Sequence, residues 1–345
     1  MARTAFAIGT QRIAPGTRAS VALPVSAMPD HTPVNLSVEV VHARRDGPTM
    51  FVSAAVHGDE IIGVEIVRRL LRAPQLKSLR GTLLVVPIVN SFGFLARSRY
   101  LPDRRDLNRC FPGSAGGSLG ARLAHIFLND VVVRCDFGID LHSAAVHRTN
   151  LPQIRVSPHD SSTARMARAF GAPVILNAAL REGSLRSEAA DRGTAVLLYE
   201  AGEALRFDEF AVRVGVAGIL RVMRNAGMLP AKSIARARTP SLICQSSQWL
   251  RAPSGGLLRT FRAEGEVVNQ GDVLAAVSDP SGDAESEIAA PRNGILIGRA
   301  VLPVVNEGDA VFHLADLGPT ADEDTVEALN AQLVADPLFD EDEII

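Results

Sequence analysis

The chain has 345 residues, a hydrophobic content of 47% and a formal net charge of -2, so it is long enough for two domains with a large core. No apolar run approaches the roughly 20 residues of a membrane span, and the N-terminus lacks the basic start and apolar segment of a secretory signal. Its three cysteines are odd in number and widely spaced, which argues against a disulfide framework. We expect a cytoplasmic protein without membrane association.

The charge is unevenly distributed. Residues 316–345 contain ten of the 38 acidic residues and no lysine or arginine, so the 36 basic residues give residues 1–315 a charge of about +8. A basic body attracts anionic substrates; the alternative is an arginine-rich composition with solvated surface charge. No aromatic residues interleave with the basic ones in a nucleic-acid-binding pattern, so we expect no nucleic-acid partner.

Strands alternate with helices after a strand-rich lead-in over residues 1–45. The expected elements, in chain order, are strands 35–41 and 51–56, helix 63–72, strand 82–89, helix 119–134, strand 137–141, helix 161–170, strand 174–177, helix 184–191, strand 194–200 and helix 207–226. This alternation predicts an α/β domain over residues 1–230, with a mostly parallel mixed sheet flanked by helices. Ligands of such sheets bind outside the carboxyl ends of the strands.

Residues 231–317 show short strands and turns, which predict a smaller all-β domain. Two segments repeat: 253–258 resembles 291–296, and 267–272 resembles 304–309. Two similar β-units related by a pseudo-twofold axis resemble the barrel-sandwich fold of biotinyl and lipoyl carrier domains. Those carriers attach their cofactor to a lysine between the repeats. Residues 279–285 contain no lysine, so a carrier role is excluded. Residues 318–345 form an acidic tail, with one helix expected over 325–333.

The motif with the most chemical content is His57-Gly58-Asp59-Glu60, which follows the expected strand 51–56. A second histidine, His142, ends the expected strand 137–141. Two histidines and one glutamate form the three-ligand set that leaves a fourth zinc position open for water. A short His-x-x-Glu sequence often arises by chance, and His57 has the alternative of being a core histidine. The strand-end position of both histidines favours a metal site.

The loop over residues 99–113 gathers four arginines among proline and acidic residues. The planar fork of arginine matches a carboxylate bidentately, so this loop is a candidate for binding a substrate carboxylate. A solvated basic loop is the alternative. The presence of the metal motif in the same chain favours substrate binding.

Four ordered motifs together resemble the succinylglutamate desuccinylase/aspartoacylase family of the zinc carboxypeptidase superfamily. They are His57-Gly58-Asp59-Glu60, Asp106-Leu107-Asn108-Arg109, Asp140-Leu141-His142 and Tyr199-Glu200-Ala201-Gly202. The resemblance covers roughly residues 45–225, and a β-domain after it is usual for the family. It implies a zinc carboxypeptidase-like fold.

The resemblance also implies a role for each motif residue at the metal. His57, Glu60 and His142 would bind one Zn²⁺ per chain. Asp106 would accept the N–H of the other ring nitrogen of His57, which fixes the tautomer and raises the basicity of the ligand.

Substrate and catalytic roles follow from the resemblance in the same way. Asn108 and Arg109 would hold a free substrate carboxylate, and Arg99 would polarise the scissile carbonyl and stabilise the oxyanion. Glu200 would accept a proton from the attacking water and pass it to the leaving amine. Arg186 matches an arginine that binds the acyl-side carboxylate in relatives.

Two alternatives and one departure accompany these roles. Glu203 could replace Glu200 as the base, and Arg186 could be a surface helix residue. Aspartoacylase-type members contact substrate with a tyrosine of the C-terminal domain. Here the only tyrosines are Tyr100 and Tyr199, so that contact is missing or replaced, which argues against N-acetylaspartate as the substrate.

The leading functional hypothesis is a zinc-dependent hydrolase that cleaves an amide next to a free carboxylate in an N-acyl acidic amino acid. An alternative is a zinc carboxypeptidase that trims glutamate tails from a ribosomal protein. It follows from the Tyr-Leu-Pro-Asp-x-Arg-Asp-Leu-Asn-Arg form of the arginine loop, which resembles a branch associated with ATP-grasp glutamate ligases. A third hypothesis is a metal-binding interaction protein without catalysis. The expected partner is a small anionic acyl-amino acid or a glutamate-rich peptide, and the sequence is compatible with a homo-oligomer.

Overall fold

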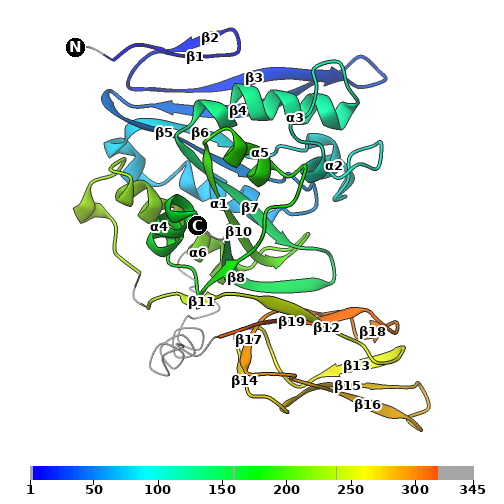
Figure 1. Cartoon of the computed structure of the whole chain (residues 1–345). Helices are drawn as coiled ribbons and strands as arrows, with labels where there is room; N and C mark the ends of the chain where they lie inside the picture. The colour runs from blue at the N-terminus through cyan, green and yellow to red at the C-terminus, as the bar shows by residue number, and fades with distance from the viewer. Residues whose placement is uncertain (1–2, 158–159, 238, 318–345) are drawn as a thin grey trace.

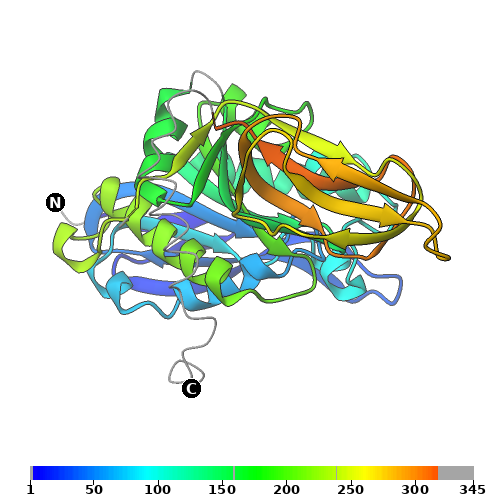
Figure 2. The same cartoon turned by 90° about the horizontal axis from the view of Figure 1, so that it is seen from below.

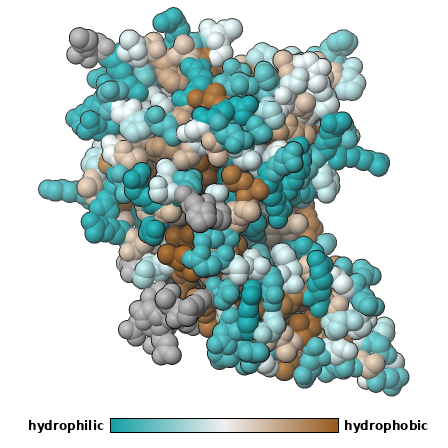
Figure 3. Space-filling model, in the orientation of Figure 1, coloured by the Kyte–Doolittle hydropathy of each residue, from teal (hydrophilic) through white to brown (hydrophobic). Residues whose placement is uncertain are grey.

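The computed structural model describes residues 3–157, 160–237 and 239–317. A large mixed sheet lies between helices, and an antiparallel β region extends from one end of it (Figure 1). None of the helices in these ranges combines the length and apolarity needed to cross a lipid bilayer. The face of the molecule in Figure 3 is mostly hydrophilic, with hydrophobic residues in small separate areas. The expected tail helix over 325–333 lies outside the described residues.

Four parallel strands form the centre of the sheet. Their order is β6 (Arg80–Val86), β5 (Arg45–Ala54), β7 (Phe137–Ala144) and β10 (Ala195–Glu203). Antiparallel strands flank this centre: β4 (Pro33–His42) and β3 (Thr17–Ala27) on one side, and β8 (Arg148–Val156) on the other. A short hairpin of β1 (Phe6–Ile8) and β2 (Gln11–Ile13) forms a separate two-stranded sheet. The arrangement confirms the predicted mixed α/β fold.

Helices cover both faces of the sheet (Figures 1 and 2). Helices α1 (Ile62–Leu70), α4 (Ser161–Phe170) and α6 (Glu209–Asn225) share one hydrophobic core with β5 side chains Met50 and Val52. Helices α3 (Leu119–Asp130) and α5 (Leu185–Asp191) share the opposite core with Phe51. Because successive strand side chains point to opposite faces, the buried half of β5 needs apolar residues on both faces, and this explains the apolar run over residues 50–52.

Most predicted elements are present in the structure, and three differences have local reasons. Strand β6 ends at Val86 rather than at residue 89, since Pro87 lacks the N–H that a central strand requires. Helix α3 ends at Asp130, because Val131 leaves the helical region (φ -121°, ψ -63°) before a 3₁₀ turn over Val132–Arg134. Strand β8 was not predicted, because Pro152 interrupts its pattern.

Several short elements complete the described chain. Helix α2 (Ser91–Ala96) precedes the arginine loop and was not predicted. The 3₁₀ turns not yet named are Pro74–Ser78, Leu107–Arg109 and Ala231–Ser233, and strand β9 (Val174–Asn177) pairs with β8. The remaining strands are β11 (Leu242–Cys244), β12 (Ser247–Arg251), β13 (Gly256–Thr260), β14 (Val267–Val268), β15 (Val273–Ser278), β16 (Glu285–Ala289), β17 (Gly294–Ala300), β18 (Val304–Val305) and β19 (Ala310–Ala315).

The strand pairing of the C-terminal region follows the repeat seen in the sequence. Strands β12 to β15 form one unit and β16 to β19 the other. Strand β12 pairs with β19 while β16 pairs with β15, and β13 pairs with β18 while β14 pairs with β17. Each pairing between the two units therefore has an equivalent with the roles of the units reversed, as a pseudo-twofold relation requires.

The C-terminal strands also continue the main sheet. Strand β17 pairs with β8, with Gly298 opposite Asn150, and β11 pairs in parallel with β9. Strand β12 thereby comes close to the carboxyl-end side of the main sheet, where Trp249 of β12 stacks on His313 of β19 with ring centroids 4.4 Å apart. The β region thus contributes side chains beside the edge of the sheet at which ligands are expected.

His313 is expected to make stability depend on pH. Burial, with a contribution from the charge of Arg155, lowers the pKa of His313 to about 3, so the folded protein holds it neutral while the unfolded chain binds a proton below about pH 6.5. Stability from this group is complete above pH 6.5 and is lost as the pH falls towards 3, by up to about 1.4 kcal/mol per pH unit. We expect the free energy of unfolding, measured with urea, to fall less between pH 7 and pH 4.5 in His313→Gln than in the unmodified protein.

The matched control is His31→Asn, which removes an exposed histidine. All unfolding curves are measured with a chelator present, so that loss of metal at low pH does not contribute. An unchanged pH dependence in His313→Gln would show that His313 is protonated in the folded protein.

Candidate metal centre and substrate cavity

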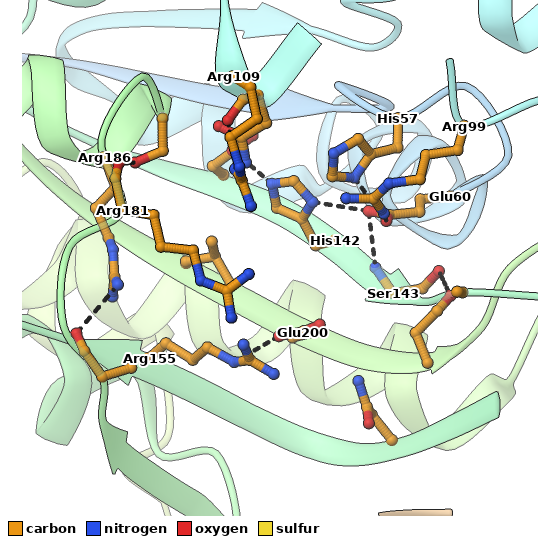
Figure 4. Close-up of a pocket in the computed structure, with 18 of the residues that line it drawn as sticks. His57, Glu60, Arg99, Arg109, His142, Ser143, Arg155, Arg181, Arg186 and Glu200 are labelled. Carbon is orange, nitrogen blue, oxygen red and sulfur yellow. Dashed lines mark hydrogen bonds and ion pairs between the residues drawn. The ribbon is translucent and has the colours of Figure 1, made fainter. Parts of the chain in front are cut away.

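Three side chains from separate segments meet at the carboxyl ends of β5 and β7. His57 lies three residues after β5, Glu60 lies just before α1, and His142 is in β7. Because β5 and β7 are parallel neighbours, their carboxyl ends lie side by side. One potential ligand atom from each of the three residues lies within 4.8 Å of the others, and all three residues are buried (Figure 4).

Gly58 lets the loop between His57 and Glu60 pass close to α2. A Cβ atom at position 58 would lie 1.9 Å from the carbonyl carbon of Gly93 and 2.2 Å from the backbone nitrogen of Phe94. Both atoms belong to the backbone and cannot move aside as a flexible side chain would. The glycine in the motif is therefore a steric requirement of this loop.

Both histidines turn the same ring nitrogen towards Glu60. The Nδ1 atom of His57 lies 2.6 Å from Oε1 of Glu60, and the Nδ1 atom of His142 lies 2.7 Å from Oε2. On the opposite side, Nε2 of His57 lies 3.0 Å from Asp106, and Nε2 of His142 lies 2.7 Å from Asp140.

This arrangement fits a bound cation. A carboxylate accepts hydrogen bonds only, so Asp106 and Asp140 fix the proton of each neutral ring on Nε2. The Nδ1 lone pairs and the Glu60 carboxylate then face one another as three electron donors. A divalent ion held by these three groups would remove this repulsion. The three residues predicted as metal ligands are therefore brought together with the chemistry that a metal requires.

The pKa shifts describe the same electrostatic coupling. Burial alone would raise the pKa of Glu60, but the charges of His57 and His142 outweigh burial and hold that pKa well below its usual value. Burial lowers the pKa of His142, and Asp140 and Glu60 overcome this effect and raise the pKa well above its ordinary value. The pocket thus favours positive charge beside Glu60, which protons or a metal ion can supply.

The cluster opens into a cavity of about 480 Å³. Six arginines line it: Arg99, Arg109, Arg148, Arg155, Arg181 and Arg186. Three acids also line it, and each is engaged: Glu60 and Asp140 with the histidines, and Glu200 with Arg155 at 2.6 Å. Within the described ranges, only Arg99 and Arg155 of these six arginines form ion pairs with carboxylates. The cavity is therefore suited to an anionic ligand.

The arginine loop supplies four of the predicted site residues. Arg99 contacts Glu60 and Asp106, both at 3.1 Å. It therefore links the group of His57, Glu60 and His142, called the metal cluster below, to the carboxylate that contacts Nε2 of His57. Asp106 is in contact with His57, as the resemblance implies. The Oδ1 atom of Asn108 accepts a hydrogen bond from the Leu185 N–H at 2.9 Å, which leaves its amide nitrogen available to an anion. Arg109 lines the same wall of the cavity.

The two remaining predicted residues, Glu200 and Arg186, also line the cavity. Glu200 of β10 is in register with His142 of β7. Glu203, the alternative base, does not line the cavity; its carboxylate accepts from the backbone N–H of His147 and from Arg206, both at 2.9 Å. Arg186 donates to the carbonyls of Ala178 and Ala179 at 3.1 and 3.0 Å. These bonds hold its side chain against the wall of the cavity that it lines.

Several cavity residues were missed by the sequence analysis. Asp140 could have been found, because it precedes His142 by two positions and strand periodicity places both side chains on one face. Arg155 lies on the unpredicted strand β8. Trp249 stacks against His313, and the guanidinium of Arg148 lies 5.2 Å from the Trp249 ring centre. Trp249 is thus the aromatic residue that the C-terminal strands contribute to the cavity.

Fold and site together define an α/β protein with a buried group of two histidines and one glutamate at the carboxyl ends of parallel strands. The model of the succinylglutamate desuccinylase/aspartoacylase catalytic domain matches residues 46–226. The chain belongs to this family, which confirms the resemblance inferred from the four motifs.

Relatives cover most of the chain. An N-α-acetyl-L-2,4-diaminobutyric acid deacetylase from Halomonas elongata is 29% identical over 307 residues, which span 82% of this chain and 86% of the relative. The crystal structure of a succinylglutamate desuccinylase/aspartoacylase from Rhodobacter sphaeroides is 26% identical, with a TM-score of 0.77, covering 87% of this chain and 95% of the other. The product-bound ectoine utilization protein EutE (DoeB) from Ruegeria pomeroyi has the same fold, with a TM-score of 0.76, 24% identity and coverage of 87% and 94%.

Proposed function

We propose that this protein is a zinc-dependent deacylase that hydrolyses the amide bond of an N-acyl acidic amino acid. The observation that carries the proposal is the buried His57, Glu60 and His142 group, which opens into a cavity lined by six arginines and Glu200. The reaction type is supported by the Halomonas elongata relative, whose name describes removal of an acetyl group from an amino acid.

Zinc is the metal that this donor set fits best. Two imidazole nitrogens and one carboxylate oxygen are the ligands of open zinc sites, and the carboxylates behind both rings provide the usual support. When bound, zinc supplies Lewis acidity, which polarises a carbonyl and lowers the pKa of water to about 7. The chain provides one such group among its described residues, so we expect one ion per chain.

The protein's own groups would divide the remaining work. Asn108 and Arg109 bind the free carboxylate of the substrate and thereby place the scissile amide beside the metal cluster. Arg99, held between Glu60 and Asp106, donates to the oxygen that gains negative charge. Glu200 accepts the proton of the attacking water and delivers it to the departing amine.

The charge of the cavity favours an acidic amino acid. The three acids of the cavity are already engaged, whereas the side chains of Arg181 and Arg186 make no ion pair with a carboxylate in the described part of the chain. A second substrate carboxylate would find partners there. The amine side chain of diaminobutyric acid, part of the substrate in the relative's name, would meet like charge instead.

The positive charge of the cavity also fits the alternative function, a carboxypeptidase that trims glutamate tails, because oligoglutamate presents several carboxylates. A metal-binding protein without catalysis is the weaker hypothesis, since it gives Glu200 no task in a cavity beside the metal cluster. Both alternatives are separated from the deacylase by the same assay.

The test is release of free amine from a substrate panel by the zinc-loaded protein. The panel contains N-acetyl-L-glutamate, N-acetyl-L-aspartate, N-succinyl-L-glutamate, N-α-acetyl-L-2,4-diaminobutyrate and tetraglutamate. We expect turnover of the acylated acidic amino acids above that of the diaminobutyrate derivative. Cleavage of tetraglutamate alone would favour the carboxypeptidase, and no turnover of any compound would overturn the proposal.

A further inference from the structure

The proton acceptor proposed above is held by an arginine that no motif singled out. Arg155 of β8 lies opposite Leu198 of the antiparallel strand β10, so Glu200 is its diagonal neighbour on the same face. The Nε atom of Arg155 lies 2.6 Å from Oε2 of Glu200, and the side chains are only 21% and 16% exposed. Partial burial reduces solvent screening, so this contact is stronger than a surface ion pair.

The surroundings of Arg155 contain more positive charge than Glu200 can balance. Arg181 and Arg186 line the same part of the cavity, on the side away from Arg99 (Figure 4). One terminal nitrogen of Arg186, Nη1, is buried without a hydrogen-bond partner. Burial, together with the charge of Arg155, lowers the pKa of Arg186 to about 10. A second anion would therefore find a hydrogen-bond donor and positive charge at this part of the cavity.

The ion pair also limits what Glu200 can do. The Nε atom of Arg155 lies against Oε2 of Glu200 at 2.6 Å, so the guanidinium blocks the approach of an attacking water molecule to that oxygen. A substrate carboxylate that enters the arginine group offers Arg155 another partner. Arg155 can then turn from Glu200 to the substrate and keep a carboxylate partner, which leaves the Glu200 carboxylate free to accept a proton.

We propose that Arg155 restrains Glu200 until a second carboxylate of the substrate binds Arg155 and Arg186 and releases it. Arg155 is then a specificity-determining residue. When a substrate with two carboxylates binds, Glu200 is free to accept a proton. When a substrate with one carboxylate binds, Glu200 stays paired with Arg155. The inference rests on the proposed function, in which Glu200 is the proton acceptor. The second carboxylate belongs either to the amino-acid side chain or to the acyl group.

The test compares kcat for matched substrates in the zinc-loaded full chain and in Arg155→Met. N-acetyl-L-glutamate is paired with N-acetyl-L-glutamine, and N-succinyl-L-alanine with N-succinamoyl-L-alanine, so that each pair differs in one charge. The unmodified protein should turn over the charged member of at least one pair about tenfold faster or more, the factor expected for one charge-assisted hydrogen bond. The pair that shows this ratio identifies the source of the carboxylate.

In Arg155→Met the ratio should fall to about one, with a higher kcat for the neutral member because Glu200 is no longer held. Arg155→Lys keeps the charge without the planar fork and should retain part of the preference. The matched control is Arg148→Met, which removes an arginine that faces Trp249 rather than Glu200. This control should retain most of the ratio.

Three results would overturn the inference. An equal loss of kcat for both members of a pair would give Arg155 a structural role. A higher KM for the charged member alone, with an unchanged kcat for the neutral one, would give it a binding role without restraint of Glu200. If Arg148→Met lowered the ratio as much as Arg155→Met, the preference for the charged substrate would come from the total charge of the cavity. Failure of the unmodified protein on all four substrates would instead count against the proposed function itself.

Discussion

Replacing His142 with alanine is expected to abolish both zinc retention and turnover. His142 is a buried member of the three-residue cluster, and its loss leaves a single imidazole and Glu60 to hold the ion. Loss of Lewis-acid stabilisation worth several kcal/mol corresponds to a fall in kcat/KM of about 10³-fold or more. Zinc per chain is measured by elemental analysis after dialysis, and turnover is measured on the best substrate of the panel.

The control for this variant is His125→Ala, which removes a histidine of α3 whose ring contacts Asn129 instead of the cavity. It should retain one zinc per chain and full turnover. A chelator should inactivate the unmodified protein, and added zinc should restore it. Full activity of His142→Ala, or of metal-free protein, would contradict the metal assignment.

The grouping of His57, Glu60 and His142 was predictable because each part of it is local in sequence. His57 and His142 both follow from the same pattern, an apolar strand that ends in a polar residue, and the carboxyl ends of parallel strands meet at one edge of a sheet. Glu60 follows His57 within one turn, so no long-range information is needed to place it.

Arg155 could not be predicted in the same way. Its strand β8 carries Pro152, and its contact with Glu200 depends on the antiparallel addition of β8 to β10, a pairing that no local pattern encodes. Trp249 is a similar case, because it reaches the cavity only through pairing between the C-terminal strands and β8. The internal repeat predicted how the C-terminal strands pair with one another, but not where they join the main sheet.

Arg186 and Glu203 show what the structure adds to a motif. As sequence, Arg186 was equally compatible with a helix surface, and Glu203 shared a strand end with Glu200. The structure distinguishes them through burial and partners: Arg186 faces the cavity, whereas both carboxylate oxygens of Glu203 are engaged by His147 and Arg206. The two nearby glutamates differ in side-chain direction, because the strand register shifts between residues 200 and 203.

Glu200→Gln is expected to lower kcat by about 10² to 10⁴-fold, the range that a positioned proton acceptor contributes. Glutamine keeps the size of the side chain, but its amide is a far weaker base than a carboxylate. Zinc content should stay at one ion per chain, because Glu200 is not part of the metal cluster. Loss of turnover with full zinc would therefore separate a role in proton transfer from a role in metal binding.

Glu203→Gln is the matched control, since it makes the same chemical change three residues away on the same strand. It should leave kcat within a few-fold of the unmodified protein, because Glu203 does not line the cavity. The reverse pattern, with Glu203→Gln inactive and Glu200→Gln active, would transfer the proton-accepting role to Glu203. That result would also remove the basis for restraint by Arg155, whose ion pair is with Glu200.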